Sequence, residues 1–183
     1  MTQRPDTDAD IHSLLDRLGR IIASDGWGGD LNPAQTAALS YLARANRFSR
    51  SPSVVAEYLG ATRGTVSQTL KALHRKGLIE ESPNPDDKRS ISYKITQAGA
   101  ALVDQRRLLH DVLDGLPNED RFALETQLSQ VVGSALKARG LRTFGACKTC
   151  RHHRSEGAEL YCTLLDLPLQ AGEADQICVE QTP

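Results

Sequence analysis

The four cysteines of the chain lie within its last 37 residues, at a spacing that suits metal ligation. Cys147, Cys150, Cys162 and Cys178 form the pattern C-x2-C-x11-C-x15-C. Two cysteines separated by two residues can present both thiolates to a metal from a tight turn, and two further cysteines complete a set of four ligands. The surrounding segment holds few apolar residues, so we expect a metal to hold it together.

The identity of this metal centre stays open between a zinc ion and an iron–sulfur cluster, which we weigh equally. Zinc ribbons usually carry two C-x2-C pairs, whereas this segment has one pair and two isolated cysteines. The stretches CKTCRHH and YCTLLDLPL, with a last cysteine close to the C-terminus, resemble high-potential iron–sulfur proteins over some 35 residues. The resemblance implies a four-cysteine cluster, which accepts irregular spacing. A cluster would make the tail a redox or iron sensor, and zinc would make it a structural cap or an interaction surface.

Two other uses of this segment carry less weight. Direct oxidation of the thiols without a metal is the third alternative. His152 and His153 follow the first cysteine pair, and either could replace a cysteine as a ligand. Because four cysteines already suffice, we expect both histidines to be surface residues.

A second set of residues suits contacts with DNA. In the segment 63–76, Val66, Leu70 and Leu73 recur at spacings of four and three, which predicts one buried face of a helix. The opposite face carries donors and acceptors with lengths that suit base edges and phosphates, namely Arg63, Thr65, Ser67, Gln68, Lys71 and Arg75. Gln68 could pair with adenine, and Arg63 or Lys71 with guanine or phosphate. An ordinary solvated face would explain any one of these residues, but not the whole set next to a charged hairpin.

Capping residues and periodicity predict the helices that position this set. Apolar residues at helical spacing predict a first helix over 8–23, and Asn32 followed by Pro33 begins a second helix over 33–44. A short helix over 53–59 is stopped by Gly60, and Thr62 caps the polar helix. A short helix, a tight turn and a longer helix are the parts of a helix-turn-helix.

A change of period after Gly77 predicts a β-hairpin. Residues Ser90-Ile91-Ser92-Tyr93-Lys94-Ile95 alternate between polar and apolar, which indicates a half-buried strand, and Leu78-Ile79 offers an antiparallel partner. The charged, turn-rich loop 82–89 lies between them. Thr96 then caps a long fifth helix, and a sixth helix follows Pro117 and ends near Gly140.

The positive charge of the chain is concentrated in this middle part. Residues 45–94 carry nine basic and five acidic side chains, a net of +4, whereas the whole chain has a formal net charge of −1. Local positive charge attracts a phosphate backbone. The charge alone would also fit a solvated surface, so the inference depends on the helix-turn-helix pattern.

From Asn32 to Gly99 the chain resembles the MarR family of winged-helix regulators. The resemblance rests on LNPAQTAALSYLA, on VVAEYLGATRGTVSQTLKALHRKGLIEE and on PNPDDKRSISYKITQAG, whose wing tip and strand end are similar to the family's DPxDRR and LTxxG patterns. In element order it covers about residues 8–140. It implies that Arg89 enters the minor groove and that Asp87 braces it. Lys88 stands where an arginine is common, which weakens its assignment as a DNA contact.

The resemblance also implies a homodimer. The first, fifth and sixth helices would pack against their symmetry mates, and the last two are apolar over more surface than one small winged domain can cover. We expect four parts: an N-terminal dimerisation helix (1–31), a winged helix-turn-helix domain (32–96), C-terminal dimerisation helices (97–140) and a four-cysteine metal-binding tail (141–183). The expected fold is mainly α-helical, with a small β-hairpin wing and a tail that a metal holds together.

The sequence therefore predicts a DNA-binding transcription regulator, a repressor that binds a palindromic operator as a homodimer. Apolar residues make up 39% and charged residues 25% of the chain, no run is long enough to span a bilayer, and no signal peptide is recognisable, so we expect a cytoplasmic protein. The chain shows no nucleophile elbow, HExxH helix, P-loop or dinucleotide fingerprint, so we expect no enzyme. Family members often bind a small-molecule effector, although no residue identifies one here. The alternative is a small iron–sulfur or zinc protein with an interaction or electron-transfer role.

Overall fold

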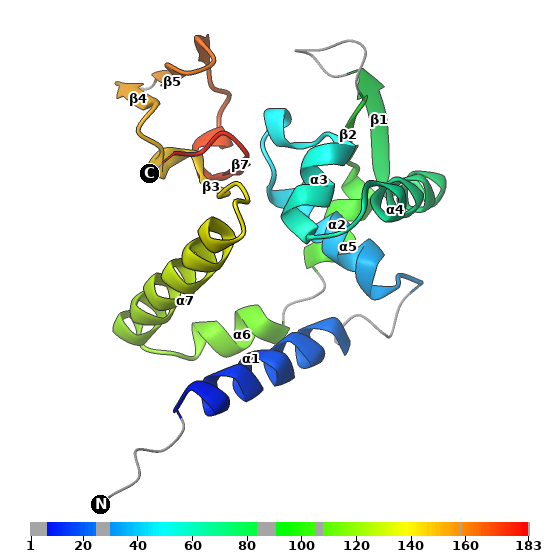
Figure 1. Cartoon of the computed structure of the whole chain (residues 1–183). Helices are drawn as coiled ribbons and strands as arrows, with labels where there is room; N and C mark the ends of the chain where they lie inside the picture. The colour runs from blue at the N-terminus through cyan, green and yellow to red at the C-terminus, as the bar shows by residue number, and fades with distance from the viewer. Residues whose placement is uncertain (1–6, 25–29, 84–90, 105–107, 158, 183) are drawn as a thin grey trace, which may run out of the picture.

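Side-chain caps fix the starts of three helices in the middle of the chain. The computed structural model describes residues 7–24, 30–83, 91–104, 108–157 and 159–182 (Figure 1). Helix α2 (Pro33–Arg44) begins with a capping box in which Asn32 and Gln35 satisfy each other's backbone N–H groups. Ser51 caps α3 (Pro52–Leu59) and Thr62 caps α4 (Arg63–Arg75). The three helices begin within one residue of their predicted starts.

A tight glycine turn links α3 and α4, as the sequence predicts. Gly60 ends α3 with φ of +60°, in the left-handed region that favours glycine. Gly77, with φ of +69°, follows the C-cap of α4 and leads into the hairpin. The short helix, turn and longer helix therefore form a helix-turn-helix.

The hairpin consists of β1 (Ile79–Pro83) and β2 (Ile91–Ile95), which pair antiparallel with Ile79 opposite Ile95. Tyr93 is buried as the alternation predicts, and its N–H donates to the Arg50 carbonyl. Ile91 differs from the prediction, because it is 40% exposed while Ser92 is buried. Ile91 pairs with Pro83, which is also exposed, at the end of the hairpin farthest from α4.

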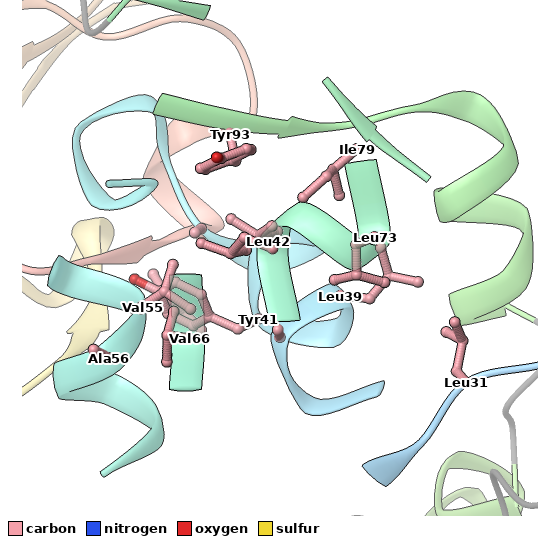
Figure 2. Close-up of a cluster of buried hydrophobic side chains, with 14 residues drawn as sticks. Leu31, Leu39, Tyr41, Leu42, Val55, Ala56, Val66, Leu73, Ile79 and Tyr93 are labelled. Carbon is pink, nitrogen blue, oxygen red and sulfur yellow. The ribbon is translucent and has the colours of Figure 1, made fainter. Parts of the chain in front are cut away.

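One apolar core holds the three helices and the hairpin together. Helix α2 contacts α3, α4 and β2, and Figure 2 shows the core side chains gathered between these helices and the strands. The fully buried side chains include Leu39, Leu42, Val55, Val66, Leu70, Leu73 and Ile79. The three apolar residues that the sequence assigns to the inner face of α4 are all among them.

Helix α5 (Gln97–Asp104) closes against this core at Gly99. Thr96 caps α5, since its Oγ1 accepts from the Gly99 N–H at 3.1 Å. A Cβ on Gly99 would overlap the Leu78 carbonyl oxygen and lie 2.8 Å from the Ile95 side chain. Only glycine therefore allows α5 to approach the α4–β1 connection this closely.

Three further helices extend away from the winged domain (Figure 1). They are α1 (Thr7–Ser24), α6 (Leu108–Asp114) and α7 (Asn118–Ala138). The sequence predicts one long fifth helix, and the described residues form α5 and α6 on either side of residues 105–107, which lie outside the described part. No described helix is long and apolar enough to cross a membrane.

The C-terminal tail contains short β-strands that the sequence pattern did not predict. Strands β4 (His153–Glu156), β5 (Glu159–Cys162) and β6 (Leu167–Pro168) form an antiparallel sheet, and β3 (Gly145–Ala146) pairs with β7 (Ile177–Cys178). Two 3-10 turns, η2 (Cys147–Thr149) and η3 (Glu173–Asp175), connect them. Strands of two to four residues are too short to give a periodic sequence pattern.

Candidate DNA-binding surface and cysteine module

The outer face of α4 is polar and exposed. Val66, Leu70 and Leu73 point into the core, so the helix presents its other side to solvent. Of the residues predicted to contact DNA, the exposed ones on this helix are Arg63, Thr65, Gln68, Lys71 and Arg75. Gln68, Lys71 and Arg75 recur at intervals of three and four residues, which places them along one side of a helix that is free to enter a groove.

Two of the predicted contact residues differ from the rest in their surroundings. The Thr65 hydroxyl lies 2.9 Å from the Thr62 hydroxyl, and the Thr65 N–H donates to that same Thr62 oxygen at 3.2 Å. Thr65 thus belongs to the cap of α4. Ser67 is only half-exposed, so it is less accessible than the other predicted contact residues.

The start of α4 leaves room for a close approach. Gly64 is exposed, and a Cβ added there would meet only the Thr62 hydroxyl, at 4.0 Å. The backbone N–H groups of a first helical turn lack intrahelical partners and attract a phosphate. The sequence predicts this use of the helix N-terminus, and the exposed geometry is compatible with it.

The tip of the wing lies outside the described residues. Asp87, Lys88 and Arg89 all belong to the segment 84–90, so their predicted roles stay predictions. The strands on either side of this segment are described and end at Pro83 and Ile91, which pair with each other. Lys94 on β2 is an exposed cation on the same hairpin that sequence reasoning did not single out.

The helices α1, α6 and α7 carry apolar side chains that the chain itself does not cover. The exposed residues include Ile11 (49%), Leu14 (66%) and Phe122 (71%). On α7, Val131 and Val132 are 54% and 55% exposed, and none of the described residues of this helix is buried. Exposed apolar stripes of this kind often mark surfaces that contact another protein.

The four cysteines lie in one small module at the end of the chain, residues 141–182. Pairing of β3 with β7 brings Cys147, which directly follows β3, beside Cys178, and Cys162 at the end of β5 pairs with His153, three residues after Cys150. Cys147, Cys162 and Cys178 are buried and Cys150 is half-buried, all as free thiols. Burial raises the pKa of Cys147 to about 12, and the other three cysteines add to this shift, so all three lie near Cys147.

No group of three or more His, Cys, Asp or Glu side chains in the described part is arranged to hold a single metal ion. The expectation that one ion joins the four sulfurs therefore finds no support in their arrangement. His152 and His153, predicted to be surface residues, are half-buried beside the module's first cysteine pair, and Arg151 Nε donates to His152 Nε2 at 3.3 Å.

The cysteine module is docked on the winged domain, a contact that sequence reasoning missed. It contacts the 3-10 turn η1 (Arg47–Ser49), which lies between α2 and α3. The Asn46 N–H donates to the Ile177 carbonyl and the Val179 N–H donates to the Ser49 hydroxyl, both at 2.9 Å. Ile177 belongs to the core of the winged domain. We call residues 45–49 the seat of the module.

Ionic and aromatic contacts reinforce this seat. Arg47 donates to the buried Glu173 carboxylate at 2.8 Å and to the Pro168 carbonyl at 2.9 Å. Phe144 packs edge-on against Tyr58 of α3, with ring centroids 5.2 Å apart. Asn46 and Ser49 stand in a polar connection between two helices, so no sequence pattern marks them as buried.

Comparison with known proteins supports the fold and the helix-turn-helix segment. Residues 29–90 match the model of the MarR family. The multiple antibiotic resistance protein MarR of Escherichia coli is 36% identical over 55 residues, and its counterpart from Salmonella typhimurium is 38% identical over 55 residues. Each alignment spans 30% of this chain and 38% of the relative, so the chain matches well under half the length of these relatives.

Solved structures extend the likeness to most of the chain. Wild-type apo MarR from E. coli is 26% identical, with a TM-score of 0.53 over 70% of this chain and 97% of that one. The MepR–DNA complex of S. aureus (20% identity, TM-score 0.54, covering 72% and 99%) and Streptococcus pneumoniae FabT in complex with DNA (20%, 0.57, covering 72% and 96%) share the fold. Residues 29–90 therefore resemble the MarR family, within a fold similar to that of these solved structures.

Proposed function

We propose that the chain is a DNA-binding transcription regulator of the MarR type. The observation that carries this proposal is the exposed polar face of α4. The apolar face of the same helix is buried in the core of the winged domain. MepR and FabT, which share the fold, were solved in complex with DNA. The described residues of α4 offer the cations and the amide that base edges and phosphates require.

The proposal includes a homodimer on a palindromic operator. The exposed apolar stripes of α1, α6 and α7 favour a second copy of the chain as partner, because a two-fold dimer buries the same stripe on both subunits. Two copies of α4 would then read two half-sites in successive major grooves, about 10 bp apart. A protein that occupies such an operator acts most simply as a repressor, by blocking access of polymerase.

The wing is proposed to add a minor-groove contact. Arg89 would enter the groove, Asp87 would hold its guanidinium, and Lys88 would contact the backbone. Lys94, exposed on β2, supplies a further cation on the same hairpin. Arg89→Ala should therefore weaken binding without changing the base preference that α4 sets.

The test starts from random duplex DNA, because the operator is unknown. Purified full-length protein selects its preferred duplex, and fluorescence anisotropy then measures affinity for that duplex and for single-base variants. Gln68→Ala should relax the preference at one position by about 1–3 kcal/mol. Lys71→Ala should weaken binding to all sequences and reduce the salt slope by about 1.

A matched control separates this surface from general charge effects. Lys137→Ala removes an exposed lysine from the end of α7, and affinity and salt slope should stay as in the wild type. Failure to enrich any sequence, or an equal loss of affinity in Lys71→Ala and Lys137→Ala, would contradict the proposed surface.

The cysteine module is proposed to act within this regulator. Its docking on the helix-turn-helix domain favours a regulatory role over the alternative of an independent electron-transfer protein, which would need no such contact. A small-molecule effector remains part of the proposal by family likeness alone.

A further inference from the structure

The interior of the cysteine module consists largely of sulfur. Among its described residues the buried side chains are Cys147, Cys162, Glu173, Ile177, Cys178 and Val179. Ile177 belongs to the core of the winged domain and Glu173 pairs with Arg47, so both face the seat. Three cysteines and Val179 remain, so the module has almost no apolar core of its own. Such a module needs a group bound by its sulfurs to hold its strands together.

Backbone and side-chain N–H groups point at these sulfurs. The Thr182 N–H donates to Cys150 Sγ at 3.4 Å. The Asn46 side-chain amide and the Glu180 backbone lie beside the Cys178 thiol. N–H donors directed at sulfur stabilise ligand thiolates and tune iron–sulfur centres.

Asn46 provides an independent sign that Cys178 serves as a thiolate ligand. The residue is fully buried, and its Oδ1 accepts from the Ser49 hydroxyl at 2.7 Å. Its Nδ2 lies near Cys178 but completes no hydrogen bond with the neutral thiol. A buried donor without an acceptor is costly. A Cys178 thiolate would be a stronger acceptor for this N–H and would remove that cost.

The spacing of the sulfurs favours a cluster over a single zinc ion. Four thiolates on one zinc, each about 2.3 Å from the metal, lie about 3.8 Å from one another in a tetrahedron. Cys150, Cys162 and Cys178 all lie near enough to Cys147 to act on its thiol, yet no three of the described cysteines are arranged around one ion. In a four-iron cluster each thiolate binds a different iron, so the four sulfurs stand farther apart.

We infer that an iron–sulfur cluster is bound by Cys147, Cys150, Cys162 and Cys178. Through Asn46 and Ser49, this cluster fixes the seat from which the helix-turn-helix begins. The inference that the cluster controls DNA binding rests on the function proposed above, whereas the inference that the cluster is present does not. Cys178 contacts Asn46, Asn46 holds Ser49, and Ser49 accepts from Val179. Ser49 is followed within three residues by α3, the first helix of the helix-turn-helix. The cluster-bound form therefore binds DNA more tightly than the cluster-free form.

The first test concerns the cluster alone. Full-length protein is purified without oxygen and incubated with ferrous iron and sulfide, and iron, sulfide, zinc and the visible spectrum are measured. We expect about four irons and four sulfides per chain. Cys162→Ser, which alters a ligand away from the seat, should lose them, and Ser155→Ala on the exposed strand β4 should keep them. Stoichiometric zinc that iron and sulfide do not replace would overturn the cluster.

The second test concerns the coupling to DNA. Affinity for the selected duplex should fall roughly tenfold on loss of the cluster, within the usual range for coupled sites. Asn46→Leu should keep the iron, shift the reduction potential of the cluster and shrink the difference between cluster-bound and cluster-free protein. Ser49→Ala should shrink that difference as well. Equal DNA affinity of the cluster-bound and cluster-free wild-type protein would overturn the coupling but not the proposed function. Absence of DNA binding in both forms would overturn the coupling and the proposed function together.

Discussion

The winged domain and the long helices bury apolar surface in opposite ways. In the winged domain, Leu39, Leu42 and Leu70 are at most 1% exposed, whereas Leu14 on α1 is 66% and Phe122 on α7 is 71% exposed. Both regions have helices with an apolar stripe, but in the described part of the chain only the winged domain covers its stripes. The difference shows which part buries its apolar side chains within one chain and which part leaves them exposed. The winged domain thus has a core of its own, while the proposed dimer depends on the open helices.

The largest expected effect comes from a cavity in the closed core. Leu42→Ala should lower the free energy of unfolding by about 2–5 kcal/mol, because the fully buried side chain leaves a cavity in a packed interior. Leu14→Ala is the matched control on the open side, and its effect on unfolding should grow with protein concentration as the dimer forms. Chemical denaturation at several concentrations measures both. An equal and concentration-independent loss in the two variants would remove the contrast between the regions.

The same contrast applies to two glycines. Gly99→Ala forces a Cβ against the Leu78 carbonyl and should lower the free energy of unfolding by about 1–3 kcal/mol. Gly133 on α7 has nothing within 4 Å of an added Cβ, and helical spacing places it opposite the stripe that includes Val131. Gly133→Ala should therefore stabilise the protein by about 0.5–1 kcal/mol. Thermal unfolding followed by circular dichroism measures the change in stability of both variants. Destabilisation by Gly133→Ala would show that this side of α7 is also packed.

The smallest expected effect lies at the edge of the winged domain. The Tyr93 hydroxyl donates to Glu81 at 3.0 Å, and burial together with this carboxylate raises the pKa of Tyr93 to about 12. A phenol whose pKa is higher in the folded state stabilises the fold below pH 10, and this contribution is lost as the pH rises from 10 to 12. Tyr93→Phe should cost about 0.5–1.5 kcal/mol at pH 7 and flatten the loss of stability between pH 10 and 12. The same slope in both proteins would assign the alkaline loss to other groups.

The sequence predicted the winged domain well because its signals are local. Caps at Asn32 and Thr62, glycines after α3 and α4, and the inner face of α4 all appear where they were expected. The exposed side of α4 follows from the same periodicity. The sequence could not show that Ser67 is less exposed than the other predicted contact residues of α4. Its partial burial depends on how α4 packs against the other elements.

The cysteine module was predictable only in its chemistry. The spacing of Cys147, Cys150, Cys162 and Cys178 indicated ligands, but the short strands that gather them carry no periodic signal. Its docking was invisible because it depends on contacts between positions about 130 residues apart, such as Val179 and Ser49. A buried Asn46 in a polar connection becomes meaningful only when Cys178 is seen beside it.

We propose that each chain has one winged domain that reads DNA, and that the exposed apolar helices join two chains into a dimer. Hydroxyl-radical footprinting of the selected duplex with full-length protein tests this claim directly. We predict two protected regions related by two-fold symmetry, with centres about 10 bp apart, and loss of the pair when Leu14 and Phe122 are both changed to charged residues. A single protected region in the wild-type protein, or protection without any preferred sequence, would contradict it.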